Sequence, residues 1–415
     1  MSLNATPRGE RTHITVFGRS NVGKSSVVNA ITGQEISVVS PIRGTTTDPV
    51  YKAMEMLPIG PVVLIDTAGL DDEGMLGELR KQKTRELIDR TDLALLVIDA
   101  TAGVDPFYEE LLAELYDRKI PVVGVLNKSD ARADAAAAQA EAEARLGLDF
   151  IPFSATQRTG IKELKQAIID ALPQEDDRFR IVGDLISPGD VVVLVVPIDS
   201  AAPKGRLILP QQQTLRDVLD SNAIAVVTQE DQLQAALNRL AVKPRLVITD
   251  SQAFSKVAAD TPKDVPLTSF SILFARHKGD LNELVRGARA IEKLKDGDRV
   301  LIAEACTHHR QSDDIGTVKI PRWLREVTGK QLQLEHVSGY SFPPDLDRYA
   351  LVIHCGACML NRRAMLHRIA ETQAAGVPIV NYGVLIAYMH GVFPRAIELF
   401  PSAMKAWEES DGPKK

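Results

Sequence analysis

Short apolar runs alternate with amphipathic stretches along the first part of the chain, from Thr12 to about Leu172. Each run is rich in β-branched residues, and helical patterns separate one run from the next. The runs are "HITVFG", "PVVLIDT", "DLALLVIDA", "IPVVGVLNKSD" and "DFIPFSA". Since neighbouring parallel strands need a long crossover, usually a helix, this alternation predicts an α/β fold with a doubly wound, mainly parallel sheet.

The same alternation returns twice after a polar break. The segment "LPQEDDRF" combines a proline with acidic residues and has no apolar period, so the first domain is predicted over residues 1–175. A smaller α/β domain over residues 181–265 is predicted from "DVVVLVVPIDS", "AIAVVTQ" and "PRLVITDS". A third domain over residues 270–415 is predicted from "RVLIAEAC", "QLQLEHV", "YALVIHCGAC" and "GVPIVNYG". The chain is therefore predicted to fold as three α/β domains.

Composition narrows the class of protein. At 415 residues, with 45% hydrophobic and 25% charged residues, the chain is long enough for several globular cores. The net charge of -6 argues against a basic nucleic-acid binder, so nucleic acid is an unexpected partner. The first residues lack the apolar core of a signal peptide, and no apolar run approaches the roughly 18 residues that span a bilayer. We therefore expect a cytoplasmic protein that does not enter a membrane.

The sequence "GRSNVGKS", from Gly18 to Ser25, fits the phosphate-binding loop pattern G-x-x-x-x-G-K-S/T. It follows the predicted strand "HITVF" and precedes the helical "SSVVNAIT", which is the context that this motif requires. Glycines let successive backbone N–H groups surround phosphate oxygens, Lys24 reaches the β- and γ-phosphates, and Ser25 ligates Mg²⁺. The residues predicted to bind the phosphates are Gly18, Asn21, Val22, Gly23, Lys24, Ser25 and Ser26.

Three further motifs follow at the ends of predicted strands. In "DTAG", Asp66 can hold the magnesium ion through water, and the amide of Gly69 can meet the γ-phosphate. In "NKSD", Asp130 offers two acceptor oxygens to the N1–H and the exocyclic amine of guanine, an edge that adenine lacks. The third motif, "SAT", is in the right place for the loop that completes the base pocket, which is predicted to consist of Asn127, Lys128, Asp130, Ser154 and Ala155. Four ordered motifs on one predicted sheet indicate a P-loop GTPase that binds GTP and Mg²⁺.

The first 172 residues resemble the GTPase domain of the TrmE/Era group of translation-factor-related GTPases. The segment "PIRGTTTDP" is similar to the first switch of that group, which makes Thr46 the expected threonine ligand of Mg²⁺. Asn21 matches an asparagine that in several members helps to bind a K⁺ ion; alternatively, its amide only stabilises the loop. Leu70 follows "DTAG", so the water-orienting glutamine of Ras-like enzymes is missing.

This resemblance implies slow GTP hydrolysis that K⁺ stimulates. Glu78 falls roughly where one relative carries a water-orienting glutamate, but the surrounding "GELRKQ" favours an ordinary helix start. The residues expected to take part in hydrolysis are Lys24, Thr46, Asp66 and Gly69.

The chain has three cysteines, and all of them lie in the last predicted domain. Cys306 ends the strand-like "RVLIAEA", and Cys355 closely follows "YALVI" as the first cysteine of a C-x-x-C pair with Cys358. Since the carboxyl ends of parallel strands face one crevice, the three thiolates can meet at one metal site. The histidines that flank the cysteines are His308, His309 and His354, three of only eight in the chain.

Several chemistries fit this spacing. The C-x-x-C pair could be two buried small residues or a redox-active dithiol. Three cysteines and a histidine could bind a structural zinc ion. Three thiolates could also hold three irons of a [4Fe-4S] cluster and leave the fourth iron with a different or exchangeable ligand.

The whole chain resembles the HydF family, the GTPase maturases of [FeFe]-hydrogenases. The resemblance depends on a TrmE/Era-like domain, a middle α/β domain and a joint cysteine and histidine pattern with forty-five residues between its two histidines. That pattern consists of Cys306, His308, His354, Cys355 and Cys358. It implies a [4Fe-4S] cluster on the three cysteines, with His308, His354, Glu304 or solvent at the fourth iron, while His309 lies outside the pattern.

The resemblance also implies a carrier function. HydF proteins hold a di-iron precursor, assembled with two radical-SAM maturases, and transfer it to apo-[FeFe]-hydrogenase. Their middle domain mediates homodimerisation, here over about residues 181–265. The alternative is an RNA or ribosome-assembly GTPase with a structural zinc site, against which the acidic net charge and the lack of a basic aromatic stretch argue.

Overall fold

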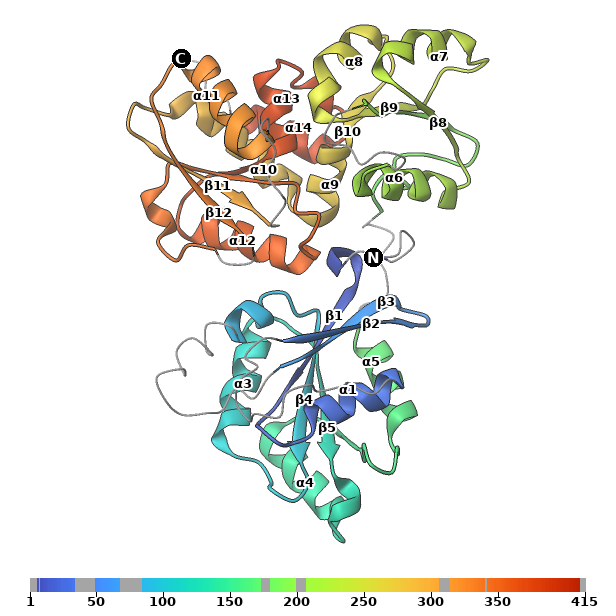
Figure 1. Ribbon diagram of the computed structural model, residues 1–415, viewed down its shortest axis with the longest axis vertical. Helices are drawn as coiled ribbons and strands as arrows, with labels where there is room; N and C mark the ends of the chain where they lie inside the picture. Colours follow the sequence, from blue (N-terminus) through green and yellow to red (C-terminus); the bar gives the residue numbers. More distant parts are fainter. Residues whose placement is uncertain are drawn as a thin grey trace. The chain divides into compact units, whose positions relative to one another are not determined.

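A computed structural model describes residues 6, 8–33, 49–67, 84–172, 180–198, 207–305, 314–339 and 342–410. The chain divides into two compact units, Met1–Asp176 and Asp177–Lys415, which are coloured blue to green and green to red in Figure 1. Among the described residues, none of the helices combines the length and the apolar character that a membrane span requires.

A six-stranded sheet forms the centre of the first unit, with the strand order β2-β3-β1-β4-β5-β6. Its strands are β1 (Thr12–Phe17), β2 (Val50–Met56), β3 (Gly60–Asp66), β4 (Leu93–Asp99), β5 (Val122–Asn127) and β6 (Phe150–Pro152). The helices between them include α1 (Lys24–Thr32), α3 (Pro106–Asp117), α4 (Ala135–Leu146) and α5 (Ile161–Ala171). All neighbouring strands are parallel except β2 and β3. The predicted doubly wound, mainly parallel sheet is confirmed.

Both faces of this sheet are covered, which explains why its central strands are continuous apolar runs. Every residue of β4 is buried. Helices α1 and α5 pack on one face, where Val28 and Ile168 meet Val97, and α3 and α4 pack on the other, where Leu112 meets Leu96. The five runs of the apolar pattern therefore correspond to β1, β3, β4, β5 and β6.

Strand β2 was not among the predicted runs. It is an edge strand that pairs antiparallel with β3, and all of its residues except Met56 are exposed or half-buried. A strand with one solvated face has no continuous apolar run, so it gives a weaker signal than a central strand.

The second unit contains two four-stranded parallel sheets, with the orders β10-β9-β7-β8 and β12-β11-β13-β14. The strands of the first are β7 (Val191–Val195), β8 (Ile224–Thr228), β9 (Leu246–Thr249) and β10 (Leu267–Ser269). Those of the second are β11 (Arg299–Glu304), β12 (Gln333–Ser338), β13 (Leu351–His354) and β14 (Ile379–Asn381). Each strand had been predicted from an apolar run, apart from the short β10 within "VPLTSFS".

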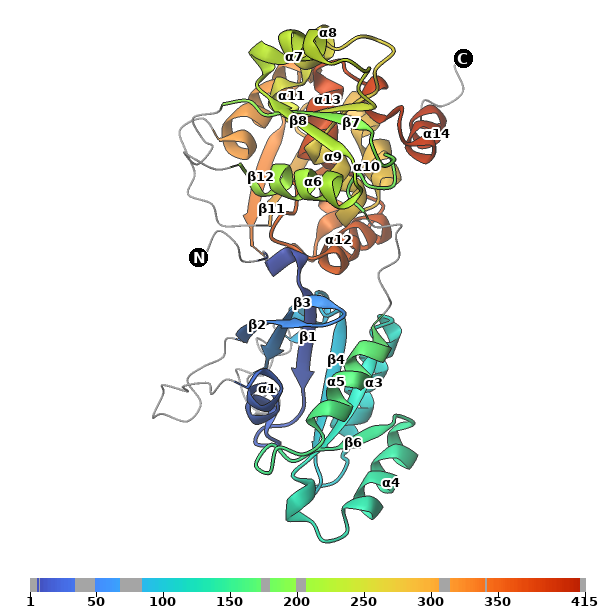
Figure 2. The same cartoon turned by 90° about the vertical axis from the view of Figure 1, so that its right-hand side faces the viewer.

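Helices connect and cover these two sheets. They are α6 (Leu209–Asp220), α7 (Leu233–Arg239), α8 (Phe254–Asp260), α9 (Phe270–Lys278), α10 (Leu281–Ala288), α11 (Ile320–Thr328), α12 (Arg362–Ala374), α13 (Tyr382–Met389) and α14 (Pro401–Glu409). One continuous hydrophobic core runs through both sheets. Helix α9 follows β10 directly and packs against α6, α12 and α13, as Figures 1 and 2 both show. The boundary expected between residues 265 and 270 thus lies within a shared core, and it stays a prediction.

Several helices of this unit begin at a polar cap directly after a strand or loop. Ser269 accepts a hydrogen bond from the amide of Ile272 at the start of α9, and Asn381 accepts one from Val384 at the start of α13. Asn361 caps α12 in the same way. Because such caps satisfy amides that have no partner in the first helical turn, each helix starts at a defined residue.

Candidate functional site

The loop between β1 and α1 is held in a tight curve by its glycines. Gly23 has a φ of 94° and lies so close to Asn127 that a Cβ would be 2.3 Å from its Nδ2 atom. Gly18 has a φ of 150°, and a Cβ there would be 2.4 Å from the carbonyl oxygen of Val97. Both positions therefore require glycine.

Lys24 lies inside this curve. Its Nζ atom donates hydrogen bonds to the carbonyl oxygens of Gly18, at 2.7 Å, and Arg19, at 2.8 Å. The side chain is 7% exposed, because the loop wraps around it. An ammonium group enclosed by a glycine-rich loop at a helix N-terminus is the arrangement that binds phosphate groups in P-loop proteins.

Ser25 and Asp66 meet at the ends of α1 and β3. The Ser25 hydroxyl donates a hydrogen bond to Oδ2 of Asp66, whose other oxygen, Oδ1, is buried and has no hydrogen-bond partner. Burial raises the pKa of Asp66, although the bond from Ser25 and the charges of Lys24 and Lys52 act against this rise. A hydroxyl beside a carboxylate with an unsatisfied oxygen suits Mg²⁺, which prefers oxygen ligands.

The predicted base-binding motif is tied to the phosphate loop. Asn127 donates from Nδ2 to the carbonyl oxygen of Val22 at 2.8 Å and accepts at Oδ1 from the amide of Ala155 at 3.4 Å. Lys128 donates from Nζ to the carbonyl oxygen of Asn21 at 2.8 Å. These bonds join three predicted binding segments that lie far apart in the sequence.

The other predicted base-pocket residues lie beside these segments. Asp130 is exposed on a 3-10 turn, Ser129–Ala131, and Ser154 is buried and accepts a hydrogen bond from the amide of Gln157 at 3.1 Å. A pocket of about 380 Å³ opens between α1 and the loop after β6. That volume is within the usual range for small-molecule sites. Its lining residues are Ser26, Asn29, Ala30, Gly33, Ala155, Thr156 and Arg158.

Asp99 is a residue of this site that sequence analysis missed. Its Oδ2 accepts a hydrogen bond from Nζ of Lys128 at 2.6 Å, and its Oδ1 accepts from the amide and the hydroxyl of Thr101. Burial works to raise the pKa of Asp99, but the bonds from Lys128 and Thr101 outweigh it and lower the pKa. The sequence did offer one signal for this residue: Asp99 is a carboxylate at the carboxyl end of β4, and β4 pairs with β1, the strand that leads into the phosphate loop.

The second unit brings two of the three cysteines to one turn after β13. Cys355 is buried and Cys358 half-buried, and neither is in a disulfide bond. The amide of Ala305, the last described residue after β11, donates a hydrogen bond to Sγ of Cys355 at 3.2 Å. Ala357 has a φ of 54°, a left-handed conformation that turns the chain between the cysteines. The sulfur of Cys355 therefore faces the end of β11.

His354 is fully buried in β13 and uses both of its ring nitrogens. Nη1 of Arg368 donates to Nε2 at 2.7 Å, so Nδ1 carries the ring proton and donates to the carbonyl oxygen of Cys355 at 2.8 Å. In this arrangement neither nitrogen has a lone pair left for a metal ion.

Glu304 lies on the same edge of the sheet as Cys355. Its Oε1 accepts a hydrogen bond from the hydroxyl of Tyr382 at 3.2 Å. Burial raises the pKa of Tyr382, and the nearby Glu304 and Cys355 raise it further. The Tyr382 hydroxyl therefore keeps its proton and donates to the carboxylate.

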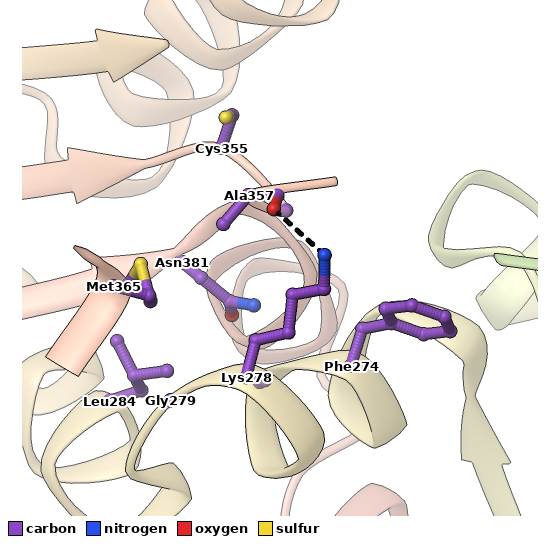
Figure 3. Close-up of a pocket in the computed structure, with 10 residues that line it drawn as sticks. Phe274, Lys278, Gly279, Leu284, Cys355, Ala357, Met365 and Asn381 are labelled. Carbon is purple, nitrogen blue, oxygen red and sulfur yellow. Dashed lines mark hydrogen bonds between the residues drawn. The ribbon is translucent and has the colours of Figure 1, made fainter. Parts of the chain in front are cut away.

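Lys278 is a second residue that sequence analysis missed. It extends from α9 toward the turn that carries the cysteines, as Figure 3 shows, and is 2% exposed. An isolated lysine in a helical pattern gives no signal that it will be buried.

Several predicted residues lie outside the described part of the chain. They are Thr46, Gly69, Glu78, Cys306, His308 and His309. Within the described ranges, no group of three or more His, Cys, Asp and Glu side chains could hold a metal ion. Those ranges contain Cys355 and Cys358 but not Cys306.

Family models match most of both units. Residues 181–279 match the hydrogen maturase F dimerization domain, and residues 282–399 match the hydrogen maturase F tetramerization domain. In the first unit, residues 13–128 match a family described as 50S ribosome-binding GTPase. The first unit is therefore a GTPase domain, and the second unit carries two domains that other chains use for oligomerisation.

Similar proteins match over parts of the chain. The tRNA modification GTPase MnmE of Paraburkholderia xenovorans (strain LB400) is 37% identical over 157 residues, which are 38% of this chain and 33% of that protein. GTPase Der of Rhizobium leguminosarum bv. trifolii (strain WSM2304) is 33% identical over 195 residues, 46% of this chain and 39% of Der. A crystal structure of an Aquifex aeolicus Era variant bound to GDP and AlF4- is 20% identical, with a TM-score of 0.36, over 55% of this chain and 98% of Era. The chain thus spans well under half the length of these two curated relatives.

Proposed function

The chain belongs to the hydrogen maturase F family, and from this premise we propose that it is a GTP-hydrolysing scaffold that binds a [4Fe-4S] cluster. In this proposal it also holds a di-iron precursor and delivers it to apo-[FeFe]-hydrogenase. The precursor would be assembled with two radical-SAM maturases. A homodimer formed through the middle sheet would present two such carriers.

The first unit would bind and hydrolyse GTP. Lys24 would neutralise charge on the β- and γ-phosphates, and Ser25, Thr46 and Asp66 would hold Mg²⁺, directly or through water. Mg²⁺, when bound, supplies positive charge to the phosphate oxygens during hydrolysis. The unsatisfied Oδ1 of Asp66 supports this assignment. The Gly69 amide would contact the γ-phosphate.

Asn21 would help to bind a K⁺ ion at the same loop. Its φ of 64° and its exposed side chain are compatible with that role. The carbonyl of Asn21 accepts a hydrogen bond from Lys128, which would hold the residue in position when a nucleotide binds. The ion would add positive charge near the transferring phosphoryl group.

One observation carries the proposal for the second unit: the amide of Ala305 donates to Sγ of Cys355. Cys306 directly follows Ala305 in the sequence, so we propose that it joins Cys355 as a ligand. Backbone N–H bonds to cysteine sulfur are also a feature that tunes iron-sulfur sites. Cys306, Cys355 and Cys358 would thus hold three irons of the cluster.

The fourth iron would have a ligand other than His354. Both nitrogens of His354 are in hydrogen bonds, and using one for iron would break the bond to Arg368 or to the Cys355 carbonyl. His308, Glu304 and solvent remain as candidates, and Glu304 already lies on the edge where Cys355 lies. A fourth position without cysteine would be the place where the cluster domain can accept another group.

Reconstitution of the full chain with iron and sulfide under anaerobic conditions tests this function. We expect a brown protein with about four irons per chain and an EPR signal from a reduced [4Fe-4S] cluster. A colourless protein that retains tightly bound zinc after the same treatment would mean that the cysteines form a structural zinc site.

A further inference from the structure

Lys278 is the last residue of α9, and its ammonium group contacts the turn that carries the cysteines. Nζ donates to the carbonyl oxygens of Ala357 and Cys358, each at 3.3 Å, and of Leu360 at 2.9 Å. Figure 3 shows the side chain extended toward this turn, with the bond to Ala357 dashed. The three acceptors belong to one short segment, so the Lys278 side chain adds three hydrogen bonds to the backbone bond from Leu360 to Ala357 in this turn.

The backbone of this turn is strained at one residue, which the hydrogen bonds from Lys278 can compensate. Ala357 has a φ of 54°, and an L-residue held in the left-handed region costs on the order of 1 kcal/mol or more. An ammonium group has three donors and no acceptor, which matches three converging carbonyl oxygens. The hydrogen bonds to Lys278 can therefore offset the strain at Ala357 and restrict the position of the Cys358 thiol.

Helix α9 is itself fixed to the elements around the cysteines. Nη1 of Arg362, in the first turn of α12, donates to the carbonyl oxygens of Arg276 and His277 near the end of α9. Gly383 of α13 lies so close to Ser271 that a Cβ there would be 2.2 Å from the Ser271 Cβ. The lysine thus projects from a helix that has little freedom to move.

The ammonium group is also shielded from bulk water. Lys278 is 2% exposed, and the cavity beside it, which Cys355, Met365 and Asn381 also line, measures only about 10 Å³. A cavity of this size holds about one water molecule. A charge in such surroundings is weakly screened and acts strongly on neighbouring groups.

We propose that Lys278 is a positioning residue of the cysteine site: it fixes the turn from Cys355 to Leu360 and places its ammonium group beside the segment that carries the two cysteines. This inference rests on the proposed function, since the charge matters to a bound cluster. A nearby positive charge favours the more negative, reduced state of a cluster and raises its reduction potential. Lys278 would therefore act both on the geometry of the ligands and on the potential of the cluster.

Two substitutions separate these effects. Lys278→Met keeps a long unbranched side chain without charge or donors, and Lys278→Arg keeps the charge but changes the geometry of the donors. Lys263→Met, at an exposed lysine of the same unit, is the matched control. The measurements are hydrogen exchange of the amides from 356 to 360 in the metal-free protein, iron per chain after anaerobic reconstitution, and the midpoint potential by EPR-monitored titration.

We expect Lys278→Met to exchange faster at residues 356 to 360, to bind less iron, and to shift the midpoint potential of the remaining cluster to a more negative value. Lys278→Arg should keep a potential close to that of the parent protein while its turn exchanges faster. Lys263→Met should match the parent protein in all three measurements. Parent-like exchange, iron content and potential in Lys278→Met would overturn the inference.

Two further results are also decisive. If Lys278→Met does not fold, exchange in Lys278→Arg decides the matter: an increase confined to residues 356 to 360 supports the inference, and parent-like exchange refutes it. If the parent protein binds no iron, the proposed function fails, but hydrogen exchange in the metal-free variants still tests whether Lys278 holds the turn.

Discussion

At the scale of single residues, polar side chains connect segments that carry binding motifs. Lys128 joins the base-binding motif to the phosphate loop through the carbonyl of Asn21. Asp99 in turn holds Lys128 from the end of β4. The Asp99 carboxylate is mostly buried, but the Lys128 side chain is 40% exposed, so solvent screening places their bond toward the lower end of the about 1.5–3 kcal/mol of a charged hydrogen bond. Such bonds are therefore strong enough to affect both nucleotide affinity and stability.

Asp99→Asn should weaken nucleotide binding without unfolding the GTPase domain. The amide keeps the bonds from Thr101 but loses the ionic bond to Lys128, so we expect the dissociation constant of GDP to rise about 10-fold, which corresponds to about 1.4 kcal/mol. Isothermal titration calorimetry at neutral pH measures this change. An unchanged affinity would show that the position of Lys128 does not depend on Asp99.

The same substitution should alter the acid stability of the first unit. The pKa of Asp99 is lower in the folded state than its ordinary value of 3.8, so its stabilising contribution is present above that pH. The contribution is lost as the pH falls through the lowered pKa. Asp99→Asn should therefore show less loss of stability than the parent protein as the pH falls below about 4.

At the scale of elements, close packing of backbone against backbone explains one glycine of the second unit. Gly287 of α10 lies against β14, and a Cβ there would be 1.8 Å from the carbonyl oxygen of Ile379. A side chain could not avoid this contact by changing its rotamer, because both atoms are fixed by the backbone. The helix would have to move away from the sheet.

Gly287→Ala should destabilise the second unit by about 3 kcal/mol, the upper part of the usual range for overpacking. Both tryptophans of the chain, Trp323 and Trp407, lie in this unit, so their fluorescence in a urea titration follows its unfolding alone. Arg286→Ala, on the more exposed side of the same helix, is the control and should cost less than about 1 kcal/mol. Equal losses in the two variants would contradict the packing argument.

At the scale of the whole molecule, the two proposed activities belong to separate compact units. The phosphate loop and the base-binding residues all lie before residue 176, and the cysteines lie after residue 177. Each unit has its own hydrophobic core. Hydrolysis and iron binding should therefore be separable by mutation, even if nucleotide-driven changes in the switches coordinate them with partner proteins.

Lys24→Ala should abolish GTP hydrolysis, at least 100-fold below the parent rate, and leave the iron content after reconstitution unchanged. Cys358→Ser should remove most of the bound iron and leave the hydrolysis rate unchanged. The rate of phosphate release measures hydrolysis. Its comparison between potassium chloride and sodium chloride at equal concentration tests K⁺ stimulation, both in the parent protein and in Cys358→Ser. Loss of iron in Lys24→Ala would show that the two units do not act independently.

The sequence by itself determined the type and order of most elements and the nucleotide motifs. This was possible because the strands of a parallel sheet covered on both faces are continuous apolar runs, and because residues such as Gly18, Lys24 and Ser25 act within one short loop. The order of motifs along the chain was also enough to predict the GTPase domain. The edge strand β2 was missed, since a half-exposed strand has no such run.

Only the tertiary structure decided which distant side chains meet. Lys278 contacts a carbonyl 82 residues away in the sequence, Asp99 holds a lysine 29 residues away, and His354 uses both nitrogens in bonds within the second unit. No periodic pattern marks such pairs, because each contact depends on how sheets and helices pack and not on spacing along the chain. A buried lysine or aspartate becomes recognisable only when the folded chain has removed it from water and supplied its partners.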